Sequence, residues 1–378
     1  MRHSMTRWLF AVAVLAAGAV AMLSLPLEGQ SELRARVDSM PGTATVKAFI
    51  ASRVAKGFAP PKTPWGDPDI SGMFDTSPEA NTPMERPAEW EGRKMDDITP
   101  AELQAAIARR QQDAVERAPF AGGGEPDQGI AIAVPIHWFD NLASVNSRPW
   151  WVIDPADGRI PRRPGVGGRG GRGGAGGGGG RGQAQGGRGQ NPAGFRPGGQ
   201  RDHYTDRSAG ERCITFGIPW RTPIIYGNAH HLIQTKDYVV FRSEMIHEAR
   251  LIPLDGRAHV ASPIKTHYGD ARGYWDGNSL VVETTNIHPD MNVYGASGAN
   301  LRVVERFTRI APDKVEWTVT IDDSRTFTQP WTYSYPMTIN ESKPIFEYAC
   351  HEGNFGMANL LSAGRLADRE GGFGGDRK

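Results

Sequence analysis

The sequence predicts an all-β module, an antiparallel meander that closes into a lipocalin-like barrel or, alternatively, folds as a sandwich. Between residues 212 and 348, short alternating or β-branched runs follow one another without a long helical pattern. The connections carry hairpin signals, because Asp255-Gly256 and Asp276-Gly277 are typical two-residue turns. This succession favours antiparallel neighbours and argues against a parallel α/β sheet.

The first 25 residues predict a signal peptide or an uncleaved N-terminal anchor. Arg2, His3 and Arg7 precede the apolar run of residues 8–25. A small-residue cleavage pattern at residues 19–21 lies inside that run, which is at the lower limit for spanning a bilayer. Both alternatives stay open, and both imply export. A cleaved signal peptide predicts a periplasmic or secreted protein, and an uncleaved segment predicts a protein anchored to the inner membrane.

The next part of the chain predicts little regular structure before the module. Residues 26–62 are weakly patterned and predict a spacer, and residues 63–163 predict an irregular N-terminal extension with one helix at 100–117. Thr99 can cap this helix, Pro100 suits its first position, and Glu102 completes a capping box.

A glycine-rich tract at residues 164–201 interrupts the chain. It holds 19 glycines and six arginines but no acidic residue, and it cannot bury enough apolar surface to order itself. We therefore expect a disordered insertion, followed by the β-barrel module at 202–363 and a disordered tail at 364–378. The net charge of +1 includes those arginines, so the rest of the chain is mildly acidic. That balance predicts neither a nucleic-acid partner nor an anionic-membrane partner.

Eight strands are expected in the module. They cover residues 238–245, 249–254, 273–275, 279–287, 301–310, 315–322, 331–339 and 345–350. Trp317 lies in phase with Val315 and Val319 and is expected in the core. Trp331 and Tyr333 share a face that suits either a core or a stacking platform for a ligand.

The two cysteines, Cys213 and Cys350, predict one disulfide if the chain is exported. Closing a loop of that length would stabilise the fold by about 4 to 5 kcal/mol in the chain-entropy model. The alternative is two buried thiols.

Strand parity predicts that charged side chains face the interior. Glu305 shares a face with Val303, Glu283 is in phase with Val281, and His247 is in phase with the apolar residues of its strand. Buried acids are costly unless they are paired, so the cluster is either a structural network or a site.

If the cluster is a site, its residues divide into two roles. The candidate general acids and bases are Glu283, Glu305, His351 and His247. The candidate ligand-contacting residues are Arg250, Asp270, Trp275, Asn286, Trp331, Tyr333, Glu352 and Asn354.

Metal-ligand spacing is weak in this sequence. There is no HExxH motif and no CxxC pair, and His230-His231 is interpreted as an exposed loop dipeptide. We therefore predict no metal and no other cofactor, with zinc held by His247, His351 and a glutamate as the alternative. The GxSxG elbow and the P-loop are also absent from the sequence.

Several segments together carry a resemblance to a family. They are residues 63–70, 154–161, 244–250, 269–277, 280–286, 305–309 and 348–354. In these segments the chain resembles a family of exported bacterial proteins of unassigned function, over about residues 60–363 apart from the glycine-rich tract. The resemblance implies export and one continuous module, and it implies no activity.

The function expected from the sequence is that of an exported envelope protein with a small-molecule site inside the barrel. That site would bind a polar organic ligand, such as a carbohydrate derivative, or act on it by acid/base chemistry. The alternatives are a non-catalytic envelope protein that recruits a partner and a metal-dependent hydrolase.

Overall fold

The computed structural model describes residues 28–116, 145–164 and 203–369, apart from residues 208, 216, 218–221 and 225. The predicted leader lies outside these ranges. The predicted glycine-rich insertion also lies outside them, apart from Pro164, as does the end of the predicted tail after residue 369.

Ten strands form one antiparallel sheet, which confirms the predicted meander. They are β1 (Gly72–Asp75), β2 (Val152–Asp154), β3 (Ala229–Gln234), β4 (Tyr238–Ser243), β5 (Ala249–Pro253), β6 (Asp270–Asp276), β7 (Ser279–Thr285), β10 (Arg302–Ala311), β11 (Lys314–Asp322) and β12 (Trp331–Ile339). Their order is β5-β4-β3-β1-β12-β11-β10-β7-β6, and β2 also pairs with β12. Strand β1 therefore joins two meanders, β3 to β5 and β6 to β12.

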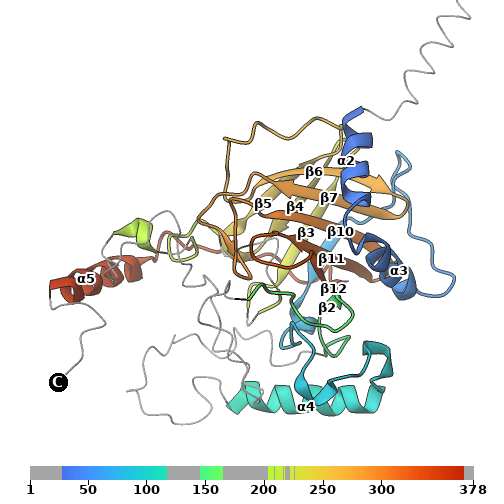
Figure 1. Ribbon diagram of the computed structural model, residues 1–378, viewed down its shortest axis with the longest axis horizontal. Coiled ribbons are helices and arrows are strands. Elements are labelled where there is room, and N and C mark those ends of the chain that lie inside the picture. Colours follow the sequence, from blue (N-terminus) through green and yellow to red (C-terminus); the bar gives the residue numbers. More distant parts are fainter. Residues whose placement is uncertain are drawn as a thin grey trace, which may run out of the picture.

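The sheet curls until its two edge strands, β5 and β6, approach each other (Figure 1). A Cβ atom at Gly273 of β6 would lie 2.7 Å from Leu254 and 2.9 Å from Ile252, so glycine permits this close approach. Strands β5 and β6 share no hydrogen-bonded ladder in the described part of the chain. The structure thus has a curled antiparallel sheet without a closed barrel.

Aromatic side chains fill the interior of the curled sheet. Trp317 lies at the centre, with ring centroids 5.1 Å from Phe241 and 5.4 Å from both Phe307 and Tyr335. Trp317, Trp331 and Tyr333 are all fully buried. The expectation that Trp317 belongs to the core is confirmed, whereas Trp331 and Tyr333 present no exposed ring to a ligand.

Two helices cover the outer face of the sheet, α2 (Glu28–Asp38) and α3 (Thr43–Arg53) (Figure 1). Leu33 and Val37, one helical turn apart, pack with Tyr274, Val281 and Val304 of the sheet. Both helices lie in the segment expected to be a spacer. The apolar stripe is short and lies between charged residues, so it is difficult to recognise in the sequence.

The predicted helix is present as α4 (Pro100–Glu116). The Glu102 carboxylate accepts a bond from Thr99 N at 2.9 Å, and Thr99 Oγ1 accepts one from Glu102 N at 3.3 Å, which is the expected capping box. Ala106 and Ile107 are buried, and Ala106 packs with Trp90 and Trp150 rather than on the sheet.

The remaining elements are short or terminal. They are β8 (Asn292–Val293) and β9 (Ala296–Ser297), the 3₁₀ turns Ser77–Glu79, Ala88–Trp90, Met95–Asp97, Tyr204–Asp206 and Met245–His247, and α5 (Phe355–Arg369). The strand predicted at residues 345–350 is wrong, because that segment is irregular and lies outside the sheet. Strands β1, β2 and β3 were not among those expected, and His230 and His231 lie in β3 rather than in a loop.

The predicted disulfide between Cys213 and Cys350 is present, with Cα atoms 5.7 Å apart. It ties the irregular segment after β12 to the chain ahead of β3. Among the described residues, no helix combines the length and the apolar character needed to cross a bilayer.

Candidate functional site

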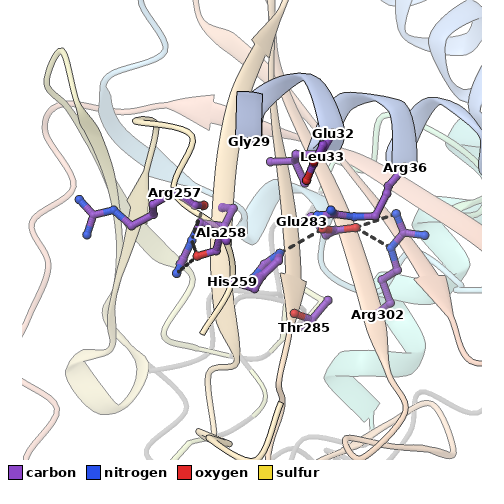
Figure 2. Close-up of a pocket in the computed structure, with 11 residues that line it drawn as sticks. Gly29, Glu32, Leu33, Arg36, Arg257, Ala258, His259, Glu283, Thr285 and Arg302 are labelled. Atoms are coloured by element: carbon purple, nitrogen blue, oxygen red, sulfur yellow. Dashed lines mark hydrogen bonds and ion pairs between the residues drawn. The ribbon is translucent and has the colours of Figure 1, made fainter. Parts of the chain in front are cut away.

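A cleft of about 510 Å³ lies on the outer face of the sheet, beneath α2. Its lining comes from α2, from the loop between β5 and β6, and from the sheet strands. The lining residues are Gly29, Glu32, Leu33, Arg36, Arg257, Ala258, His259, Arg272, Glu283, Thr285 and Arg302. Figure 2 shows Arg36, His259 and Arg302 directed toward Glu283 at the centre, whereas the Arg257 side chain points away from it.

Helix α2 is held over the cleft by its apolar stripe and by a close backbone approach. A Cβ atom at Gly29 would lie 1.8 Å from the carbonyl oxygen of Gly256, so only glycine fits there. This contact sets the start of the helix against the β5–β6 loop, and Leu33 and Val37 dock the rest of it. As a result, Arg36 projects over the sheet at Glu283.

Glu283 is the centre of the polar network. Its side chain is only 2% exposed, and its Oε2 atom lies 2.8 Å from Arg36 Nη2 and 3.0 Å from His259 Nε2. Its Oε1 atom accepts a hydrogen bond from Arg302 Nε at 2.7 Å. Burial raises the pKa of Glu283, but His259, Arg36 and Arg302 together outweigh that effect and lower it to about 2. Glu283 is therefore an ionised acceptor at neutral pH.

His259 connects Glu283 to a second carboxylate. Its Nδ1 atom lies 2.8 Å from Asp270 Oδ2, which also accepts a bond from Val260 N at 2.9 Å. Asp270 is in turn paired with Arg272, whose remaining N–H groups donate to the carbonyls of residues 257 and 258. Because both ring nitrogens of His259 face carboxylate oxygens, both contacts are hydrogen bonds only when the ring carries two protons.

The predicted convergence of acids inside the sheet is wrong. Glu283 and Val281 do share a face, as expected, but that face lies beneath α2. Glu305 faces the filled interior with Val303 and Phe307. The prediction of which side chains share a face was correct for each strand. It does not show which face of the sheet is the interior, because helices bury the outer face as well.

Glu305 forms a separate buried ion pair with Arg250. Arg250 is 6% exposed and Glu305 is fully buried, and both Arg250 terminal nitrogens contact the carboxylate, one of them at 3.0 Å. Trp317 Nε1 donates to the same carboxylate at 3.2 Å. Aromatic rings surround the pair, so it has the features of a structural network.

The predicted histidines lie apart from both networks. His247 is exposed in a 3₁₀ turn, where its Nδ1 atom is 3.1 Å from the carbonyl oxygen of Tyr348. His351 and Glu352 are exposed in the segment after β12. Asn354 bonds the carbonyl of Glu211 at 3.0 Å, beside the disulfide.

The other predicted ligand contacts have structural surroundings. Trp275 is partly buried against the interior core. Asn286 donates from Nδ2 to the carbonyl of Val260 at 2.8 Å and so supports the loop that carries His259. Asp270 lies in the polar network, although it does not line the cleft itself.

Sequence reasoning missed Arg36, Arg302 and His259. Arg36 lies in the supposed spacer, and His259 lies in a loop without a motif. Arg302 lies on the face of β10 opposite Glu305, as the alternation of side chains along a strand requires. The signal that could have found it is that Glu283 and Arg302 lie in two consecutive predicted strands, 279–287 and 301–310, which pair in the sheet and bring the two side chains to the same face.

A second polar cluster lies in the loops that flank β6 and β7. In the described residues, one set of side chains has metal-ligand geometry: His267, His288 and Asp290, whose ligand atoms all lie within 4.8 Å of one another. The imidazole rings are stacked with centroids 4.5 Å apart. The pKa of His267 is lowered, mainly by burial. The neighbouring His288 and Arg212 lower it further, whereas Asp290 raises it. The zinc alternative based on His247 and His351 has no such geometry.

Comparisons with protein-family models, with curated proteins and with solved structures give no match to this chain.

Proposed function

We propose that this chain is an exported protein that binds a small polar organic acid in the cleft beneath α2. One observation carries the proposal. Arg36 uses one terminal nitrogen for Glu283, and its remaining N–H groups make no hydrogen bond to the described residues while they line a cleft large enough for a small molecule.

The charge of the lining supports an anionic ligand. Arg36 and Arg302 direct their guanidinium groups into the cleft at Glu283, whereas Arg257 and Arg272 are paired with Asp255 and Asp270. Two guanidinium groups thus face the single carboxylate of Glu283, so a carboxylate on a ligand would balance the second positive charge. An arginine fork binds such a group through two parallel hydrogen bonds.

The contacts support binding rather than acid/base catalysis. A general base needs a free lone pair within reach of its substrate. Each ring nitrogen of His259 lies within hydrogen-bond distance of a carboxylate, and Glu283 is held by Arg36, Arg302 and His259. Neither group can take a proton from a ligand without first losing a partner.

Export is part of the same proposal. The charged and apolar pattern of residues 1–25 supports a signal peptide, and a disulfide is typical of oxidising compartments such as the periplasm. We further propose that the curled sheet is an open variant of the lipocalin-like barrel, with edge strands that approach without pairing and an interior filled by side chains. On this proposal, the ligand binds on the outer face of the curled sheet and not in its interior.

Calorimetric titration with a panel of sugar acids and dicarboxylic acids tests the proposal, with D-glucose as the neutral counterpart of D-glucuronate. We expect at least one acid to bind and the neutral sugar not to bind. Arg36→Met keeps the apolar stem of the side chain but removes its charge, and we expect it to weaken binding by about tenfold or more.

Arg34→Met is the matched control, because Arg34 is also an α2 arginine with similar exposure, 45% against 50%, and pairs with Asp276 instead. It should leave the affinity unchanged. Equal losses in both variants would contradict a specific role for Arg36. A panel without any binding acid would favour the alternative, a non-catalytic envelope protein in which the ion network only fastens α2.

A further inference from the structure

The main chain brings His267 and His288 side by side from two different loops. Thr266 and Ile287 form a parallel bridge, with His288 N donating to Thr266 O at 2.7 Å and Thr266 N donating to Asn286 O at 3.1 Å. The residues that follow in each segment are the two histidines, so their relative position is fixed by backbone hydrogen bonds rather than by the flexible ends of side chains.

The third member, Asp290, lies two residues after His288. Its Oδ2 atom is 3.6 Å from His288 Nδ1, and its backbone N–H donates to the same ring nitrogen at 3.2 Å. All three ligand atoms lie within 4.8 Å of one another. In a tetrahedral zinc site the ligand atoms are about 3.4 Å apart, given bonds of about 2.1 Å. Small side-chain rotations would therefore close the set around an ion.

The ring of His267 provides an independent observation that points to a ligand. Its Nε2 atom is buried and has no hydrogen-bond partner among the described residues. A buried ring nitrogen without a partner is unfavourable, and a metal ion satisfies it. The three residues are only half-buried, so an ion can reach them from solvent.

We propose that His267, His288 and Asp290 form a binding site for a divalent transition-metal ion, for which Zn²⁺ is the probe. Two imidazoles and one carboxylate match the preferences of first-row divalent metals, and three protein ligands leave at least one coordination position open for water or a small ligand. The site uses none of the residues that line the cleft, so it does not depend on the function proposed above.

Arg212 is the neighbouring group that opposes binding. Its Nη2 atom lies 3.8 Å from Asp290 Oδ2, a loose ion pair that competes with a metal for the carboxylate. Removing this charge without touching a ligand therefore tests the electrostatics of the site separately.

The experiment is a calorimetric titration of the full, untagged, chelator-treated protein with ZnCl₂, together with the absorption spectrum of the Co²⁺ form. We expect one ion per chain, with Co²⁺ bands typical of nitrogen and oxygen ligands. Asp290→Asn and His267→Gln should each weaken Zn²⁺ by more than about tenfold. Arg212→Gln should leave the affinity equal or increase it.

The control is His203→Gln, which alters an exposed histidine outside the set and should not change the affinity. Circular dichroism of every variant checks that the sheet is intact. Absence of Zn²⁺ binding by the wild-type protein would overturn the proposal. So would Zn²⁺ binding that is as tight in folded Asp290→Asn and His267→Gln as in the wild type.

Discussion

Glu283 and Glu305 lie on neighbouring strands, and their carboxylates point to opposite faces of the sheet. Glu283 pairs in register with Val304, the residue directly before Glu305. One carboxylate therefore lies in a cleft beneath α2, and the other lies among aromatic rings in the interior. This separation predicts different consequences for removing each charge.

Glu283→Gln should destabilise the fold by about 3 kcal/mol, because it leaves Arg36, Arg302 and His259 without their common anion. Chemical denaturation at pH 7 measures this change. Glu32→Gln, which alters an exposed acid on the rim of the same cleft, should change the stability by less than about 0.5 kcal/mol. Equal effects of the two substitutions would contradict the central place of Glu283.

The pH dependence of stability should carry the signature of Glu283. Its folded pKa is about 2, below the ordinary value of 4.5, so its contribution is fully present above pH 4.5. The contribution is lost as the pH falls from 4.5 toward 2, when the folded carboxylate becomes protonated. The stability difference between wild type and Glu283→Gln should therefore shrink across this window.

Denaturation of both proteins at closely spaced pH values between 2 and 7 measures this difference. If it stayed constant down to pH 2, Glu283 would not be held ionised by its partners.

Glu305→Gln should lower the stability without changing binding in the cleft. The substitution leaves the Arg250 guanidinium buried beside a neutral side chain, at a cost of about 3 kcal/mol or more. Replacing both members, as Arg250→Met with Glu305→Leu, should recover part of that loss because no uncompensated charge remains. Denaturation and ligand titration of the same samples check both parts, and weakened ligand binding in folded Glu305→Gln would argue for an interior site.

The disulfide should contribute about 5 kcal/mol, since it closes a loop with a sequence separation of 137 residues. Cys213→Ser with Cys350→Ser should therefore melt well below the oxidised wild type. The wild type with a reductant should approach the double variant. Identical melting temperatures with and without reductant would mean that the bond adds nothing to stability.

The sequence predicted the strands β4, β5, β7, β10, β11 and β12, and residues 273–275 of β6, because their alternation and their turns are local signals. It missed β1 and β2, which have four and three residues, too few for a period to emerge, and it missed β3, whose two histidines were interpreted as a loop dipeptide. It also placed a strand at residues 345–350, where the disulfide and irregular contacts prevail over an apolar pattern. Helix α2 was missed because its apolar stripe becomes visible only against the sheet it covers.

The candidate site was only partly predictable for the same reason. The parity of Glu283 and Glu305 followed from their strands, and each has the neighbours on its own face that were expected. Which face is enclosed depends on how the whole sheet curls, and the partner Arg36 comes from 247 residues away in sequence. His267 and His288 are brought together by a bridge between two loops, and no motif marks such a pairing.

A crystal structure with the organic acid that binds most tightly tests the account most directly. The account predicts the ligand on the outer face of the sheet, with its carboxylate within hydrogen-bond distance of Arg36 and its body beside His259 and Thr285. A ligand found among the aromatic rings beside Arg250 and Glu305, or elsewhere on the surface, would contradict it.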